Sequence, residues 1–271
     1  MTAQPPETER HAAGRGSGHP PARTWIRPLL LVMCACAVSQ GFARFTFSFV
    51  LPEMTEDVLG SYSVAGLLSG ANLGAYLLGV LVMTSLAPRF EATRLLKAGL
   101  ALTAAGLLLT ALAPGTVTLF AGMAMAGLCS AAVWIPTPSI VAAYVPAAHR
   151  GLGFGLVTAG IGASIAATGP AVTLLQRVFG EGQWRPVWGL TVLMALAALV
   201  LQLFFLKPVG AAEGIPSRIP GRSLRGLLTE TGTLLLSYFL YGVGFSLHTN
   251  YLIAALQQDL DFTAASATRV F

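Results

Sequence analysis

An arginine within a long apolar segment is the residue with the most evident chemistry in this sequence. Arg44 lies sixteen residues into the apolar run 28–51, about 24 Å along a helix from its start. A charge at that depth in a membrane costs about a few kcal/mol or more, so it usually faces a cavity or a partner. Because a guanidinium binds a carboxylate through two parallel hydrogen bonds, Arg44 is a candidate anchor for an anionic group. The alternative is a structural clamp that reaches the membrane surface or the helix carbonyls.

Neutral polar residues near Arg44 favour a hydrated cavity. Gln40 and Ser48 lie four residues before and after it, and this spacing puts side chains on one face of an α-helix. Asn72, in a second apolar run, is a further candidate for the lining. We expect these three residues to contact a small-molecule solute together with Arg44.

A second polar stripe lies near the end of the chain. Tyr238, Tyr241, Phe245 and His248 are spaced by three or four residues and share one helical face. One interpretation is a cavity lining in which His248 carries a coupling proton. The other interpretation is a set of interfacial aromatic residues with a hydrogen-bonded histidine near the outer membrane surface.

Composition determines which elements position these residues. The chain has 271 residues, of which 55% are hydrophobic and only 10% charged, as in a polytopic membrane protein embedded in a lipid bilayer. Seven apolar segments are long enough to cross a bilayer as helices, which requires about 20 residues. They are 28–51, 63–86, 95–113, 117–145, 151–175, 187–206 and 227–256. We therefore predict an all-α fold.

The distribution of Lys and Arg predicts the orientation. Most basic residues fall in the N-terminal tail and in alternate connections: Arg10, Arg15, Arg23, Arg27, Arg89, Arg94, Lys97, Arg150, Lys207, Arg218, Arg222 and Arg225. Arg177 and Arg185 fall on the opposite side. By the positive-inside rule the N-terminus is cytoplasmic. We expect the protein to lie in the plasma membrane, which is the inner membrane in a cell that has two membranes. The net charge of +5 is thus a topology signal and does not indicate nucleic-acid binding.

Four regions follow from these patterns. Residues 1–27 are rich in Pro, Gly and Arg and predict a disordered cytoplasmic tail. Residues 28–206 form a half of six transmembrane helices, and 207–226 a basic cytoplasmic linker. Residues 227–271 then restart the pattern, because 244–265 is similar to 42–65. Internal repetition of helix groups is typical of secondary transporters.

Short motifs make the similarity more specific. Gly41-Phe42-Ala43-Arg44-Phe45 and Leu51-Pro52-Glu53-Met54 resemble the G-x-x-R-F and L-P-x-M pattern of major facilitator superfamily transporters of the bacterial YbfB/YjiJ type. The stretch 238–245 is similar to their Y-F-L-x-G-x-G-Y, and 86–94 to the superfamily's basic cytoplasmic motif, with Arg89 and Arg94 retained. The resemblance implies a six-helix bundle followed by the first helix of a second half. It also implies that the chain is truncated after its seventh helix.

In this family the first, fourth and seventh helices line a central cavity. The resemblance therefore adds Trp134 and Thr137 of the segment 117–145 as candidate solute contacts. The prolines at 136 and 138 should also interrupt this helix locally. Glycine-rich faces at 66–74 and 151–167 correspond to contacts between halves, although packing within the first half is an alternative.

The sequence contains no catalytic triad, phosphate-binding loop or metal-ligand spacing, so we predict no enzyme activity, cofactor or metal. The predicted function is secondary active transport of a small, anionic solute by alternating access. The alternative is a non-transporting fragment or an accessory membrane subunit. The sequence does not identify the solute, the direction of transport or the coupling ion.

Overall fold

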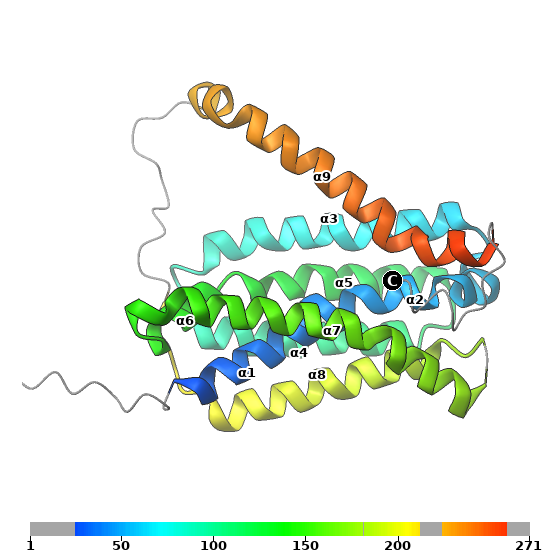
Figure 1. Cartoon of the computed structure of the whole chain (residues 1–271). Helices are drawn as coiled ribbons and strands as arrows, with labels where there is room; N and C mark the ends of the chain where they lie inside the picture. The colour runs from blue at the N-terminus through cyan, green and yellow to red at the C-terminus, as the bar shows by residue number, and fades with distance from the viewer. Residues whose placement is uncertain (1–24, 181, 212–223, 259–271) are drawn as a thin grey trace, which may run out of the picture.

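All regular secondary structure in the described part of the chain is helical. The computed structural model describes residues 25–180, 182–211 and 224–258 (Figure 1). Within these residues, six helical spans are long and apolar enough to cross a membrane. They are Ile26–Leu59, Tyr62–Leu86, Ala92–Ala111, Thr116–Tyr144, Ala147–Phe179 and Arg185–Phe205. The predicted all-α, polytopic membrane fold is confirmed.

A further long helix follows the six spans. Helix α9 (Leu224–Gln258) contains the apolar stretch Thr231–Phe245. It packs against α2 (Ala43–Met54). Its Leu256 is buried, with 9% exposure. Figure 1 shows α9 close to the bundle at its C-terminal part and diverging from it toward its N-terminal part. The predicted tail (except residues 25–27), most of the predicted linker and the repeat beyond residue 258 lie outside the described residues.

The first span is longer than its sequence pattern predicted. It runs through α1 (Ile26–Cys36), a π-helical turn η2 (Ala37–Phe42), α2, and a second π-helical turn η3 (Thr55–Leu59). The predicted end at residue 51 is wrong by eight residues. Pro52 removes only one backbone donor, and the Thr55 hydroxyl donates to the Leu51 carbonyl at 2.7 Å in the same turn. The helix therefore continues past its proline.

The last part of this helix, beyond Pro52, is held by side-chain bonds to its neighbours. Asp57 forms an ion pair with Arg185 at 2.8 Å and accepts a hydrogen bond from the Trp184 indole at 2.9 Å. Glu53 accepts a hydrogen bond from the Gln176 amide at 2.8 Å. These contacts join the end of the first span to α7 (Arg150–Phe179) and α8 (Arg185–Phe205). Charged residues that ended the predicted span thus stabilise its last turns.

The predicted break in the fourth span is confirmed. Helix α5 (Thr116–Trp134) ends just before Pro136, and α6 (Thr137–Tyr144) begins directly after it. The Thr137 hydroxyl donates to the Val133 carbonyl at 2.8 Å and so satisfies an acceptor at the break. A short 3₁₀ turn, η4 (Ala147–His149), leads from α6 into α7.

The segment after α8 is bound to the bundle. Ala92, at the start of α4 (Ala92–Ala111), donates its backbone N–H to Val209 at 3.1 Å. Val209 in turn donates to the Thr93 hydroxyl at 3.1 Å, and the Tyr144 hydroxyl donates to the Lys207 carbonyl at 2.8 Å. The first residues of the predicted linker are therefore attached to the six-span bundle.

Glycines allow the backbones of the central helices to come into direct contact. A Cβ placed at Gly79 of α3 (Tyr62–Leu86) would lie 2.2 Å from the Leu128 carbonyl oxygen of α5. A Cβ at Gly106 of α4 would lie 2.7 Å from the backbone nitrogen of Ala126. A Cβ at Gly74 of α3, in contrast, has no atom within 4 Å. The α3–α5–α4 layer is therefore closely packed, while part of α3 faces away from it.

The glycine-rich faces predicted from the sequence, at 66–74 and 151–167, also contain both packed and open positions. A Cβ at Gly66 would lie 2.5 Å from the Tyr251 hydroxyl of α9. Cβ atoms at Gly70, Gly151 and Gly155 would have nothing within 4 Å among the described residues. Packing within the first half therefore does not account for these open positions. Their contact with a second half stays a prediction.

Gly79→Ala should destabilise the protein, because the new methyl group collides with a backbone oxygen that cannot rotate away. We expect a loss of about 1–3 kcal/mol, the typical penalty of overpacking. The matched control is Gly74→Ala on the same helix, which should be neutral or slightly stabilising because alanine favours the helix. Thermal unfolding in detergent measures both. Equal melting temperatures for the two variants would contradict the close α3–α5 packing.

Candidate functional site

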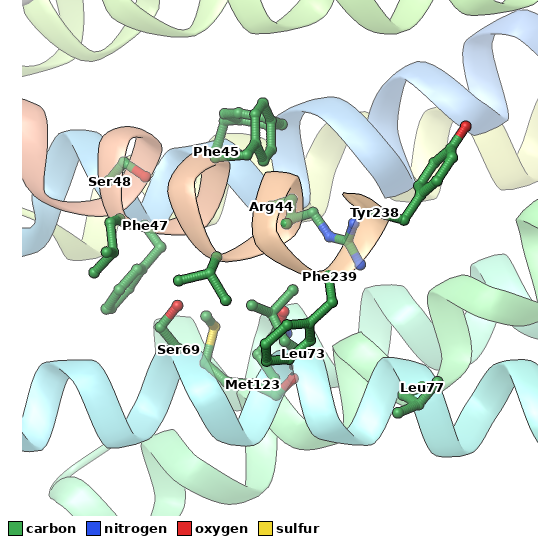
Figure 2. A pocket seen from close by; sticks show the side chains of 15 residues that line it. Arg44, Phe45, Phe47, Ser48, Ser69, Leu73, Leu77, Met123, Tyr238 and Phe239 are labelled. Carbon is green, nitrogen blue, oxygen red and sulfur yellow. Dashed lines mark hydrogen bonds between the residues drawn. The ribbon is translucent and has the colours of Figure 1, made fainter. Parts of the chain in front are cut away.

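A cavity of about 650 Å³ lies between the first span and α9 (Figure 2). Its lining comes from α2, α3, α5 and α9. The residues are Arg44, Phe45, Phe47, Ser48, Ser69, Asn72, Leu73, Leu77, Met123, Tyr238, Phe239, Gly242, Val243, Phe245 and Leu247. The volume is typical of small-molecule sites, which span about 300–1,000 Å³.

Arg44 is the charged residue of this lining. Its guanidinium carbon lies 4.2 Å from the centre of the Tyr76 ring, in a cation–π contact with α3. Its Nη2 atom is buried without a hydrogen-bond partner. The ion pairs among the described residues, Arg94–Glu91 and Arg185–Asp57, do not involve it. Arg44 therefore has an N–H donor available and no anion among the described residues to compensate its charge.

The backbone around Arg44 positions it at the cavity. The π-helical turn η2 ends two residues before Arg44, and such turns are frequent at functional sites. A Cβ on Gly41 would lie 1.7 Å from the Ser164 hydroxyl, so this turn lies directly against α7. A second cavity of about 10 Å³ adjoins Arg44 and is lined in part by Ser39, whose hydroxyl is also buried without a partner. Two buried polar atoms without partners, Ser39 Oγ and Arg44 Nη2, thus lie near the junction of η2 and α2.

Three of the predicted contacts lie in the cavity with Arg44. Ser48 is 1% exposed and lies one turn beyond Arg44 on α2. Asn72 lines the cavity from α3, but its amide nitrogen donates to the Met123 carbonyl at 2.7 Å. Tyr238 lines it from α9 with 70% exposure. The bond from Asn72 to Met123 joins α3 to α5. The amide N–H that makes this bond is therefore not available to a solute.

Gln40 and Thr137 do not line this cavity. The Gln40 amide donates to the Ser130 carbonyl at 3.0 Å, joining η2 to α5. Gln40 lies within the π-helical turn, where hydrogen bonds span five residues, so a spacing of four no longer gives a common face with Arg44. Thr137 is fully buried, and its hydroxyl lies 3.4 Å from the Cys36 sulfur.

Trp134, Tyr241 and His248 also lie outside the lining of the main cavity. Trp134 packs against Phe154 of α7, with ring centres 5.7 Å apart. Tyr241 is exposed and stacks on Phe245 at 5.9 Å. His248 is exposed on α9. The cavity-facing side of α9 thus includes Tyr238 and Phe245 of the predicted stripe, together with Phe239, but not Tyr241 or His248.

Sequence reasoning missed the apolar residues that make up most of the lining. Phe45 and Phe47 come from α2, Met123 from α5 and Phe239 from α9 (Figure 2). Phe45 contacts Phe245 edge to face at 6.2 Å, which joins α2 to α9. In a chain with this many apolar residues, no spacing separates a cavity-facing phenylalanine from one in the core. The partner of Arg44, Tyr76, had a detectable signal, because it lies four residues after Asn72 on the same face.

Comparisons with known proteins agree with this architecture. The Major Facilitator Superfamily pattern matches residues 33–271. The uncharacterized transporter YgaY of Escherichia coli, in strains K12 and O157:H7, is 31% identical over 179 residues, 65% of this chain. The chain spans 44% of the length of these relatives.

Solved structures share the fold at low sequence identity. A bacterial homolog of the human lysosomal transporter Spinster, inward-facing and occupied, aligns with a TM-score of 0.62 and 14% identity over 90% of this chain and 56% of that chain. A peptide transporter POT in complex with sulfate aligns with a TM-score of 0.58 and 19% identity over 88% of this chain and 47% of that one. The bundle, the match along the chain and these likenesses agree: the chain belongs to the major facilitator superfamily and is a multi-pass membrane protein of a transporter family.

Proposed function

We propose that this protein is part or all of a secondary active transporter that moves a small anionic solute across the plasma membrane by alternating access. The observation that carries the proposal is Arg44, a charge within the first span whose Nη2 donor is buried without a partner at the edge of a 650 Å³ cavity. An unpaired buried charge is destabilising unless a ligand or water compensates it. Arg44 is therefore the proposed solute anchor, with Ser48, Asn72 and Tyr238 as neighbouring contacts.

The two sides of the cavity support alternating access. Arg44 and Asn72 belong to the six-span bundle, while Tyr238 and Phe239 belong to α9. We assign the bundle, residues 28–206, to one half of the transporter, and α9 to the start of the other, joined by the linker 207–226. Rocking of one half against the other would open the site to each side of the membrane in turn.

Two finer assignments belong to the same proposal. Membership of the YbfB/YjiJ-type subgroup rests on the G-F-A-R-F stretch, in which Gly41 lies against α7 and Arg44 reaches the cavity. Coupling to a proton rests on His248 of α9, whose exposed imidazole is a group that can carry a proton. We assign His248 to coupling and not to solute contact, because it does not line the cavity.

A second candidate function is that of an accessory subunit without transport activity of its own. Gly70, Gly74, Gly151 and Gly155 have open space above them, and small residues at such spacing allow another membrane helix to approach closely. Reconstitution separates the two functions. Solute flux in vesicles that contain this chain alone supports the transporter, whereas its absence together with stable binding of another membrane protein supports the subunit.

Arg44→Gln should remove anion binding, because it deletes the charge and keeps a side chain of similar reach. Loss of a charge-assisted hydrogen bond of about 1.5–3 kcal/mol corresponds to an affinity lower by about 10- to 100-fold. The test anions are acetate, benzoate, succinate and gluconate. Binding is measured by the rise in melting temperature that each anion causes in the detergent-solubilised chain, and transport by the current that it produces in proteoliposomes. Arg27→Gln, an exposed arginine at the start of α1, is the control for loss of one charge. Anion responses that survive in Arg44→Gln would contradict the anchor.

Tyr76→Leu should weaken binding of the same anions by about 2- to 30-fold, since the cation–π contact that orients Arg44 contributes about 0.5–2 kcal/mol. Tyr76→Phe retains the ring and should bind almost as well as the unmodified chain. Titration of both variants by melting temperature measures the difference. Equal affinities for the leucine and phenylalanine variants would exclude an orienting role of the ring.

Cysteine labelling tests the predicted cytoplasmic N-terminus. In a variant whose cysteines at positions 34, 36 and 129 are replaced by alanine, Gln183→Cys places a thiol between α7 and α8, and Arg89→Cys one between α3 and α4. Both positions are exposed. A membrane-impermeant maleimide should label position 183 in intact cells and position 89 only after permeabilisation. The reverse pattern would invert the topology.

A further inference from the structure

The lining of the main cavity restricts the chemistry of its solute beyond a negative charge. We propose that the solute is an organic monoanion with an apolar body. This inference rests on the proposed function, because it takes Arg44 as the anion anchor. It adds the nature of the rest of the molecule, which the anchor alone does not define.

The charge of the lining supports a single negative group. Arg44 is its only charged residue among the described part of the chain, and no Asp, Glu, Lys or His lines the cavity there. Among the described residues of the lining, a second anionic group would have no basic partner, and an ammonium group would have no carboxylate partner. Desolvation of either group without a partner is costly. Dianions and zwitterions such as amino acids are therefore disfavoured.

Three of the four neutral polar side chains of the lining are engaged within the protein, and Tyr238, which is 70% exposed, is the fourth. The Asn72 amide nitrogen donates to the Met123 carbonyl at 2.7 Å. Ser48 and Ser69 also have interaction partners of their own. Each solute hydroxyl that enters such a site loses hydrogen bonds to water without replacement, which costs about 1–3 kcal/mol. Sugars and sugar acids are therefore poor matches.

The rest of the lining fits an apolar body. Phe45, Phe47, Leu73, Met123 and Phe239 surround the space beside Arg44 (Figure 2). Aromatic and leucine side chains gain free energy when they cover apolar surface, and methionine adapts to its shape. The Tyr76 ring covers one face of the planar Arg44 guanidinium. The unpaired Nη2 atom lies at the edge of the guanidinium, where a carboxylate binds in the plane of that group. A carboxylate on the edge and an apolar body in the cavity are geometrically compatible.

A matched ligand series tests this solute class on the detergent-solubilised 271-residue chain. 3-Phenylpropanoate has one carboxylate and an apolar body, L-phenylalanine adds only an ammonium group, and gluconate has a hydroxylated body. Affinities come from the ligand-dependent rise in melting temperature. We expect 3-phenylpropanoate to bind at least about tenfold more tightly than the other two, and Arg44→Gln to lower that affinity by about tenfold or more.

Phe239→Ala tests the apolar contact. Phe239 is 66% exposed, so its removal leaves the core intact, and loss of the ring should weaken 3-phenylpropanoate binding by about tenfold. Phe204→Ala on α8, 79% exposed and outside the cavity lining, should bind like the unmodified chain. Equal loss in both variants would contradict an apolar contact at Phe239.

The outcomes separate the inference from the proposed function. If gluconate or L-phenylalanine binds as tightly as 3-phenylpropanoate and depends on Arg44, the apolar solute class is wrong and the anion anchor stands. If 3-phenylpropanoate binds equally to the unmodified chain and to Arg44→Gln, the anchor is wrong and the inference fails with it. If none of the three ligands binds, the inference is overturned, and the acetate, benzoate and succinate measurements decide the proposed function.

Discussion

A guanidinium in the membrane-spanning part of a helix needs either an anion or water, and this constraint underlies the organisation of the site. Arg44 obtains only part of that compensation from the protein, through the face of the Tyr76 ring 4.2 Å away. Its buried Nη2 has no acceptor, and no described carboxylate lies within ion-pair distance. The lining around it is mostly apolar, so it does not replace a solute or water as a partner. The stability of the charge is thus coupled to what enters the cavity.

The helices that surround Arg44 differ in how firmly they are held. Close contacts at Gly79 and Gly106 bring the backbones of α3, α4 and α5 together. At one end of the bundle, Asp57 binds Arg185 and Trp184; at the other, Val209 bonds to the start of α4. Helix α9 packs on α2 and α3 mainly through its C-terminal part, while Tyr238 and its neighbours are largely exposed. A well-packed bundle that carries the charge, faced by a less buried helix, suits a site that opens and closes.

The sequence predicted the fold well because each span carries its own signal. Long apolar runs located the six spans, and the prolines at 136 and 138 located the break in the fourth. Boundaries set by charge were less accurate: Glu53 and Asp57 looked like the end of a span, yet their bonds to Gln176 and Arg185 stabilise its last turns. Such partners are more than a hundred residues away, so local pattern does not reveal them.

The site was predictable only in part, and for a geometric reason. Arg44 was evident from the cost of its charge, and Ser48 from regular helical spacing. Gln40 lies outside the cavity lining because the π-helical turn η2 changes the helical phase just before Arg44. Trp134 and Thr137, added by family resemblance, pack against Phe154 and Cys36 instead. The apolar lining leaves no periodic signal in a chain that is 55% hydrophobic.

Restoring charge at position 44 by chemical modification tests the central claim most directly. In a variant that carries Arg44→Cys and no other cysteine, alkylation can attach either a positively charged or a neutral group of similar size at the same atom. The account predicts that binding of 3-phenylpropanoate, lost in the unmodified variant, returns with the positive adduct and not with the neutral one. Equal binding with both adducts, or with neither, would contradict a role for the charge of Arg44 in holding the solute.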